Sequence, residues 1–187
     1  MENDILKAPY LTLEHIRLKA SEFLERYCPE HSIPIPIEDI IELRLHIQII
    51  LLPGLKQGLD VEGFLTSDLM KIYIDEWIFS NRINRARFTL CHEVEHSIMH
   101  KKLYETMKIG SVDEWKHLLN CIDPREYSFF EYHANTFAGL VLVPTEELKN
   151  TFSNAIEMYK SEGYDPRELM SSAIAIDYIS TYLARRF

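Results

Sequence analysis

Apolar residues recur every three or four positions from Leu11 to Tyr27, and this spacing predicts an amphipathic helix. Thr12 stands where an N-cap residue accepts hydrogen bonds from the first helical turn. A second stretch with helical spacing, IEDIIELR, follows two closely spaced prolines. The chain should therefore begin with a long helix followed by a short one.

Three later stretches have the composition of β-strands. HIQIILLP is rich in β-branched residues and ends at Pro53, while DVEGFLT and MKIYID are separated by a turn near Ser67 and Asp68. Together these stretches predict a small antiparallel sheet of three strands.

Helical patterns return in the second half of the chain. One helix should run from about Asn84 to about His100. Another should begin after Asp123, which can cap it, because Pro124 suits the first helical position and Glu126 completes a capping box. The predicted fold class is α+β, mainly helical, with the three-stranded sheet packed beside the helix of residues 84–100.

Composition and charge exclude several classes of protein. A hydrophobic share of 47% supports a buried core. The net charge of -9 disfavours direct binding of nucleic acid, which usually requires a basic face. The three cysteines are widely spaced, and this spacing predicts reduced thiols rather than disulfides. With no signal-peptide pattern and no apolar run long enough for a membrane span, we expect a cytoplasmic protein without a membrane partner.

The candidate chemistry lies in RFTLCHEVEHSIMH, residues 87–100. His92 and His96 are one helical turn apart, roughly 40° from each other around the axis, so both can reach one zinc ion. Glu93 lies to one side of that face, where a carboxylate can take a proton from a water molecule at the ion. The motif is short, and a solvated helix face carrying two histidines is the plain alternative.

Two histidines do not complete a zinc site. The metzincin spacing would place a third histidine at position 102, which is Lys102. The gluzincin arrangement takes a glutamate from a later helix, and Glu131 fits that description. Asn135 lies one turn further on the same face, where it can hold the ring of a zinc-binding histidine. His133, on the opposite side of that helix, is a weaker candidate ligand.

Taken together, RARFTLCHEVEHSIMH and the later EYHANTFAGLVLVP resemble the ImmA/IrrE family of gluzincin metallopeptidases, over roughly residues 82–144. The resemblance implies that the zinc ligands are His92, His96 and Glu131. It places Glu93 as general base and Asn135 at the asparagine of the family motif. It also implies limited proteolysis of a helix-turn-helix repressor encoded nearby, which relieves repression of mobile-element, phage or stress genes.

One residue departs from the family pattern. Glu95 stands where the family usually has glycine, and helix geometry places it beside the metal-binding face. There it would pair with an arginine at position 82, 85 or 87, or line the substrate cleft. His100 continues the row of histidines and should cap the helix or lie just beyond the ligands.

A competing interpretation is a binding module that regulates a partner without cutting it, such as a toxin–antitoxin or phage regulatory component stabilised by zinc. It shares the ligands and differs in the role of Glu93. We find no helix-turn-helix in the chain, so the expected partner is a separate DNA-binding protein. A peptidase also needs a donor for the oxyanion, and the sequence does not choose among Tyr104, His117, Tyr127, Tyr132 and Tyr178.

We expect one domain over residues 1–187, with a catalytic core of residues 1–144 and a C-terminal helical extension of residues 145–187. Thr145 would be the N-cap of the first helix in that extension. The stretch between His100 and Glu131 should form either a lid over the cleft or a packed helix with a loop.

Overall fold

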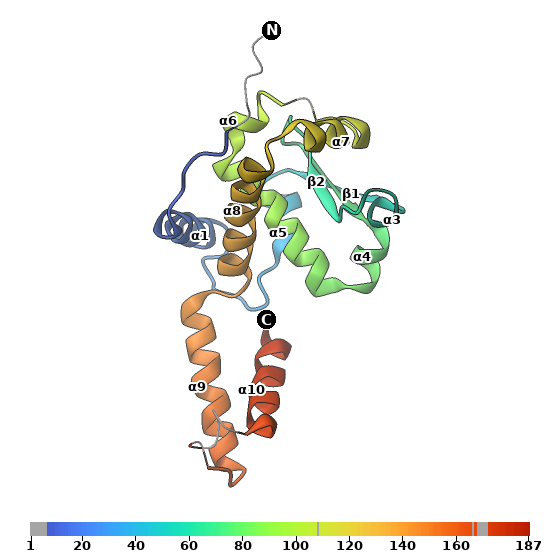
Figure 1. Cartoon of the computed structure of the whole chain (residues 1–187). Coiled ribbons are helices and arrows are strands. Elements are labelled where there is room, and N and C mark those ends of the chain that lie inside the picture. Colours follow the sequence, from blue (N-terminus) through green and yellow to red (C-terminus); the bar gives the residue numbers. More distant parts are fainter. Residues whose placement is uncertain (1–6, 108, 166, 168–171) are drawn as a thin grey trace.

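The computed structural model of the chain describes residues 7–107, 109–165, 167 and 172–187. Figure 1 shows helices arranged around a small sheet, with α5 near the centre. The strands are β1 (Gln48–Leu52), β2 (Gly63–Leu65) and β3 (Lys71–Asp75). The helices are α1 (Leu13–Tyr27), α2 (Ile37–Asp39), the π-helical turn η1 (Ile40–Arg44), α3 (Leu55–Leu59), α4 (Glu76–Asn81), α5 (Ile83–Met99), α6 (Lys101–Tyr104), α7 (Val112–Cys121), α8 (Pro124–Leu142), α9 (Thr145–Ser161) and α10 (Ala173–Arg186).

The mainly helical α+β fold is confirmed, but the sheet is mixed rather than antiparallel throughout. Its strand order is β1-β3-β2, and β2 pairs with β3 in the expected antiparallel sense. β1 and β3 are parallel. The chain reverses direction after β1, through α3, and again after β2, and β3 then enters between the first two strands. Because the chain reverses direction twice, β1 and β3 run in the same direction.

Helix α5 is packed between the sheet and α8, and it contacts β2, β3 and α8 (Figure 1). Its apolar residues Leu90 and Val94 are fully buried, as are Ile72 and Ile74 of β3 and Phe137 of α8. These side chains recur at helical spacing on α5 and on alternate positions of β3, which is why one face of each element enters the core. The packing fixes α5 in both position and rotation.

Two predicted N-caps have different outcomes. The Thr12 hydroxyl accepts a hydrogen bond from the backbone N–H of His15 at 3.2 Å, as expected. The prediction for Thr145 is wrong, because Thr145 is already the first residue of α9 and Pro144 precedes it without a side-chain hydrogen bond. The proline sets its own backbone angle and stops α8 just before this point.

Asp123 caps α8 as predicted, and its carboxylate accepts hydrogen bonds from the backbone N–H groups of Arg125 and Glu126. The Glu126 carboxylate has a different partner from the one a capping box provides. It accepts a hydrogen bond from the backbone N–H of Ala8 at 2.8 Å. This bond ties the segment before α1 to the first turn of α8.

The final helices α9 and α10 pack against each other and project away from the rest of the molecule (Figure 1). The C-terminal residue nevertheless returns to α5. Arg87 is buried on α5, and its guanidinium donates hydrogen bonds to the carbonyls of Phe187 at 2.9 Å and Ile35 at 2.7 Å. One arginine therefore joins α5, the segment before α2 and the chain end.

The cysteines Cys28, Cys91 and Cys121 are all free thiols, as their spacing predicts. Within the described ranges, every helix falls short of the length and hydropathy that a membrane crossing requires.

We predict that Gly63→Ala destabilises the fold by about 1–3 kcal/mol, because overpacking at a closed position carries such a cost. An added Cβ would lie 2.8 Å from the Tyr73 carbonyl oxygen and 2.9 Å from the Thr89 methyl group on α5. Gly139→Ala is the matched control, since nothing lies within 4 Å of its added Cβ. It should stabilise α8 by about 0.5–1 kcal/mol. Chemical denaturation measures both, and equal effects of the two substitutions would contradict the close packing of β2 on α5.

Candidate metal centre

Two helices bring together the three residues that the sequence marks as metal ligands. α5 presents His92 and His96, and α8 presents Glu131, with one ligand atom of each residue within 4.8 Å of the others. Nε2 of His92 lies 3.6 Å from a carboxylate oxygen of Glu131. The imidazole planes of the two histidines are perpendicular, with centroids 5.0 Å apart, so both rings border one small space.

Asn135 fixes the orientation of one ligand ring. Its side-chain oxygen lies 3.1 Å from Nδ1 of His92, and an amide oxygen can only accept a hydrogen bond. Nδ1 therefore carries the proton, and Nε2 is directed to the side where Glu131 lies. A partner of this kind commonly holds a metal-binding histidine in place.

The three groups carry different charges before a metal binds. Burial alone would lower the pKa of His92, but hydrogen bonding to Glu131 and the nearby carboxylates raise it to about 9. Burial alone would raise the pKa of Glu131, and the hydrogen bond from His92 lowers it below its usual range. The metal-free protein at neutral pH thus holds an ion pair here. A bound cation must displace the proton on Nε2 of His92.

His96 is held by its surroundings in the neutral form. Its ring is buried and stacks on Phe130, with centroids 4.7 Å apart, and on Tyr104, at 5.3 Å. Burial lowers the pKa of His96 well below its usual range. Nδ1 lies 2.9 Å from Nδ1 of His100, which is the C-cap residue of α5. Both predicted positions of His100, at the helix end and just beyond the ligands, are therefore found together.

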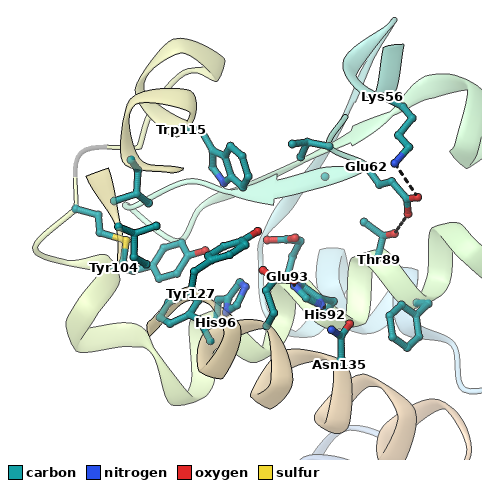
Figure 2. A pocket seen from close by; sticks show the side chains of 18 of the residues that line it. Lys56, Glu62, Thr89, His92, Glu93, His96, Tyr104, Trp115, Tyr127 and Asn135 are labelled. Atoms are coloured by element: carbon teal, nitrogen blue, oxygen red, sulfur yellow. Dashed lines mark hydrogen bonds and ion pairs between the residues drawn. The ribbon is translucent and has the colours of Figure 1, made fainter. Parts of the chain in front are cut away.

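Glu93 lies beside the three ligands, with its carboxylate directed into the same space (Figure 2). The side chain is 5% exposed, and Oε2 accepts a hydrogen bond from the backbone N–H of Leu65 on β2 at 2.9 Å. Burial raises the pKa of Glu93 to about 7, although the nearby His92 acts in the opposite sense. A carboxyl group with a pKa near neutrality can both take and return a proton.

Both expectations for Glu95 are wrong. Its side chain is completely buried, it does not border the cleft, and it has no arginine partner among the described residues. Oε2 instead lies 2.8 Å from Nδ1 of His96 and 2.9 Å from Nδ1 of His100. The arginines are engaged elsewhere: Arg85, for example, pairs with Glu62 at the mouth of the cleft. Helix geometry predicts the angular position of Glu95 around α5. It does not predict which other elements pack over that position.

The three candidate ligands and Glu93 line a cleft of about 260 Å³ (Figure 2). Trp115 and Leu118 of α7 form another wall, and both are half-buried against the core. Of the two forms considered for this stretch, the packed helix is therefore the one found. Lys56 and Glu62 also line the cleft. No sequence pattern indicated these four residues, because only tertiary packing brings their segments to the site.

The structure narrows the choice of oxyanion donor to two of the five candidates. Tyr104 and Tyr127 line the cleft, and the proximity of the Tyr127 hydroxyl helps to lower the pKa of Glu131. The other three lie elsewhere: His117 contacts Cys121, Tyr132 borders a different hollow, and Tyr178 donates to Glu162. Tyr104 is buried whereas Tyr127 is half-buried, so only the latter combines contact with solvent and contact with a ligand.

Two imidazoles and a carboxylate are the donor set of catalytic zinc sites, and an Asn135 that orients His92 fits such a centre. A buried His/Glu metal-binding group, a carboxylate beside it and an open cleft define a metallopeptidase of the gluzincin type. The family model described as the IrrE N-terminal-like domain of the M78 peptidases matches residues 44–187. The chain therefore belongs to this ImmA/IrrE family of metallo-endopeptidases. No curated protein matches the chain closely enough to count as a relative.

We predict that Glu93→Gln stabilises the metal-free protein at pH 8 but not at pH 4.5. The folded chain keeps a proton on Glu93 up to a pKa of about 7, whereas the unfolded chain loses it near the ordinary value of 4.5. Unfolding free energy therefore falls as pH rises between these values, by up to about 3 kcal/mol. Glutamine removes the buried charge and can still accept the hydrogen bond from Leu65.

Denaturation of the metal-free protein at both pH values measures this effect. The exposed residue Glu42 provides the matched control, and Glu42→Gln should leave stability unchanged at both pH values. A gain from Glu93→Gln that is equal at pH 4.5 and pH 8 would show that charge burial at Glu93 is not its cause.

Proposed function

We propose that this metallo-endopeptidase uses zinc to cleave a separate helix-turn-helix repressor, and so relieves repression of mobile-element, phage or stress genes. The observation that carries the proposal is the convergence of His92, His96 and Glu131 beside the buried carboxylate of Glu93. The family of the chain makes a protein the substrate. The repressor is what the family resemblance implies for that substrate.

The donor set supports zinc as the metal. Two neutral imidazole nitrogens and one carboxylate oxygen leave a position open for water or substrate, as catalytic zinc sites do. Sites for magnesium or calcium are instead built mainly from oxygen ligands. We assign His92, His96 and Glu131 as the three ligands.

Glu93 is assigned as the general base. When bound, the ion supplies Lewis acidity that polarises the scissile carbonyl and acidifies the attacking water. Glu93 receives the proton of that water and passes it to the leaving amine. The Leu65 N–H occupies Oε2, so Oε1 is the oxygen available for this transfer.

The edge of the sheet supports binding of an extended polypeptide. β2 is an edge strand in the order β1-β3-β2, and Val61, Glu62 and Gly63 line the cleft. An extended peptide can add to such an edge through main-chain hydrogen bonds. We expect the scissile segment to lie beside β2, which places its carbonyl near the ligands on α5.

The charge of the chain is compatible with a DNA-binding substrate. The formal net charge is -9, and proteins that bind phosphate backbones present basic surfaces. Opposite net charges speed the encounter of two proteins and make its rate sensitive to salt. A binding module would use the same charge complementarity. The two functions differ only in whether the partner protein is cleaved.

We predict that Glu93→Gln retains one zinc at this centre and lowers cleavage by about 10²–10⁴-fold, the usual range for loss of a positioned base. The substrate to test is the helix-turn-helix protein encoded beside this gene, incubated with and without chelator. Mass spectrometry of the fragments gives both the rate and the cleavage site. Glu42→Gln should behave as the unmodified chain. If Glu93→Gln leaves regulation of the target genes intact, the chain acts by binding rather than by cleavage.

We assign Tyr127 as the oxyanion donor, and we predict that Tyr127→Phe lowers kcat by about 10²–10³-fold with little change in KM. The lost hydroxyl would act on charge that develops only in the transition state. Tyr132→Phe is the matched control, because Tyr132 lies on the same helix and borders a different hollow. Steady-state kinetics and metal analysis test this pair, and a rate loss that follows lost metal would reassign Tyr127 to holding Glu131.

A further inference from the structure

A second group of potential metal ligands lies behind His96, outside the cleft. Glu95, His100 and His133 each offer a ligand atom, and these atoms lie within 4.8 Å of one another. All three side chains are at most 1% exposed. His100 is in contact with both of the others: Nδ1 lies 2.9 Å from Oε2 of Glu95, and Nε2 lies 3.1 Å from Nδ1 of His133.

The Glu95 carboxylate is the unusual member of the group. Both oxygens are buried, and neither has a hydrogen-bond partner in the described part of the chain. The approaches of 2.8 Å and 2.9 Å to His96 and His100 are ion-pair distances without hydrogen-bond geometry. Burial of a carboxylate costs several kcal/mol unless a cation or hydrogen bonds compensate it. Among the described residues no lysine or arginine pairs with Glu95, so the compensating charge must come from histidine protons or from a bound ion.

The spacing is compatible with a bound ion. One ligand atom from each of Glu95, His100 and His133 lies within 4.8 Å of the others, and donor atoms around a tetrahedral zinc at about 2.0–2.1 Å lie roughly 3.3 Å apart. His100 approaches Glu95 with Nδ1 and His133 with Nε2. Only one of these nitrogens can bind a given ion, so ion binding requires His100 or a neighbour to rotate. Two imidazoles and one carboxylate are again the donor types that zinc prefers.

His133 also borders a surface hollow, which is lined by Phe129 and Tyr132 of α8 and by Tyr10 and Leu13. The cleft of the first centre is lined by a separate set of residues. Because His133 is only 1% exposed, an ion would enter from this hollow as the side chains around it move.

We propose that Glu95, His100 and His133 form a second, structural site for a divalent transition-metal ion such as zinc. The site joins the C-terminal end of α5 to the middle of α8, the two helices that also supply the first site. It requires the Glu95 carboxylate, whose two oxygens have no hydrogen-bond partner among the described residues. The second site does not depend on peptidase activity.

The test is a count of metal ions per chain. Metal-free protein is dialysed against excess Zn²⁺, freed of loose metal, and analysed by elemental and native mass spectrometry. We expect two zinc ions per unmodified chain and one for Glu95→Gln. His92→Ala, which removes a first-site ligand, should also hold one, and the combined variant none. Glu42→Gln should hold two, because its carboxylate is exposed. Loss of the second ion should lower Tm by several degrees while the first ion remains bound.

Two results would overturn the second site: one ion per unmodified chain, or two ions retained by Glu95→Gln. If Glu95→Gln does not fold, His133→Asn gives the same count from the α8 side, with circular dichroism as the check on folding. Substitution with Co²⁺ adds an independent readout, since the visible absorbance should titrate in two steps and lose one of them in either variant. One ion with substrate cleavage would contradict only this site, whereas two ions without cleavage would contradict only the proposed function.

Discussion

The contact between α5 and α8 is the constraint on which the centre depends. The histidines on α5 are separated from Glu131 by more than thirty residues of sequence, so the ligand set exists only while these two helices stay packed. Leu90 and Val94 on one helix and Phe137 and Ala138 on the other are fully buried and supply this packing. The apolar core thus holds the candidate metal ligands within 4.8 Å of one another.

Buried charge is the cost of this arrangement. Glu93 and Glu95 both lie inside the molecule, two residues apart on α5, and burial raises the pKa of each. Their environments differ, since Glu93 receives a main-chain hydrogen bond and faces the cleft, whereas Glu95 is covered on all sides. A helix that packed only for stability would carry apolar residues at both positions. Two buried carboxylates on one helix therefore mark this part of α5 as a candidate functional site rather than a purely structural one.

Much of the fold and the convergence of the candidate ligands could be predicted because they follow from local patterns. Helical spacing predicted the first residue of α5 to within one position. The cap at Asp123 predicted where α8 begins, and hence on which face of α8 Glu131 lies. Strand direction could not be predicted, because it depends on β3 entering between two earlier strands. The cover over Glu95 and the placement of Trp115 at the cleft likewise come from segments distant in sequence. The division of the chain at Pro144 into a core and an extension stays a prediction.

The hydrogen bond from Leu65 to Glu93 has a consequence for how this protein can diversify. The donor is a main-chain amide, so the Glu93 carboxylate keeps this hydrogen bond whatever side chain stands at position 65, with proline as the exception. Side chains on this strand can therefore change in sequence while the position of the Glu93 carboxylate beside the candidate metal centre is kept.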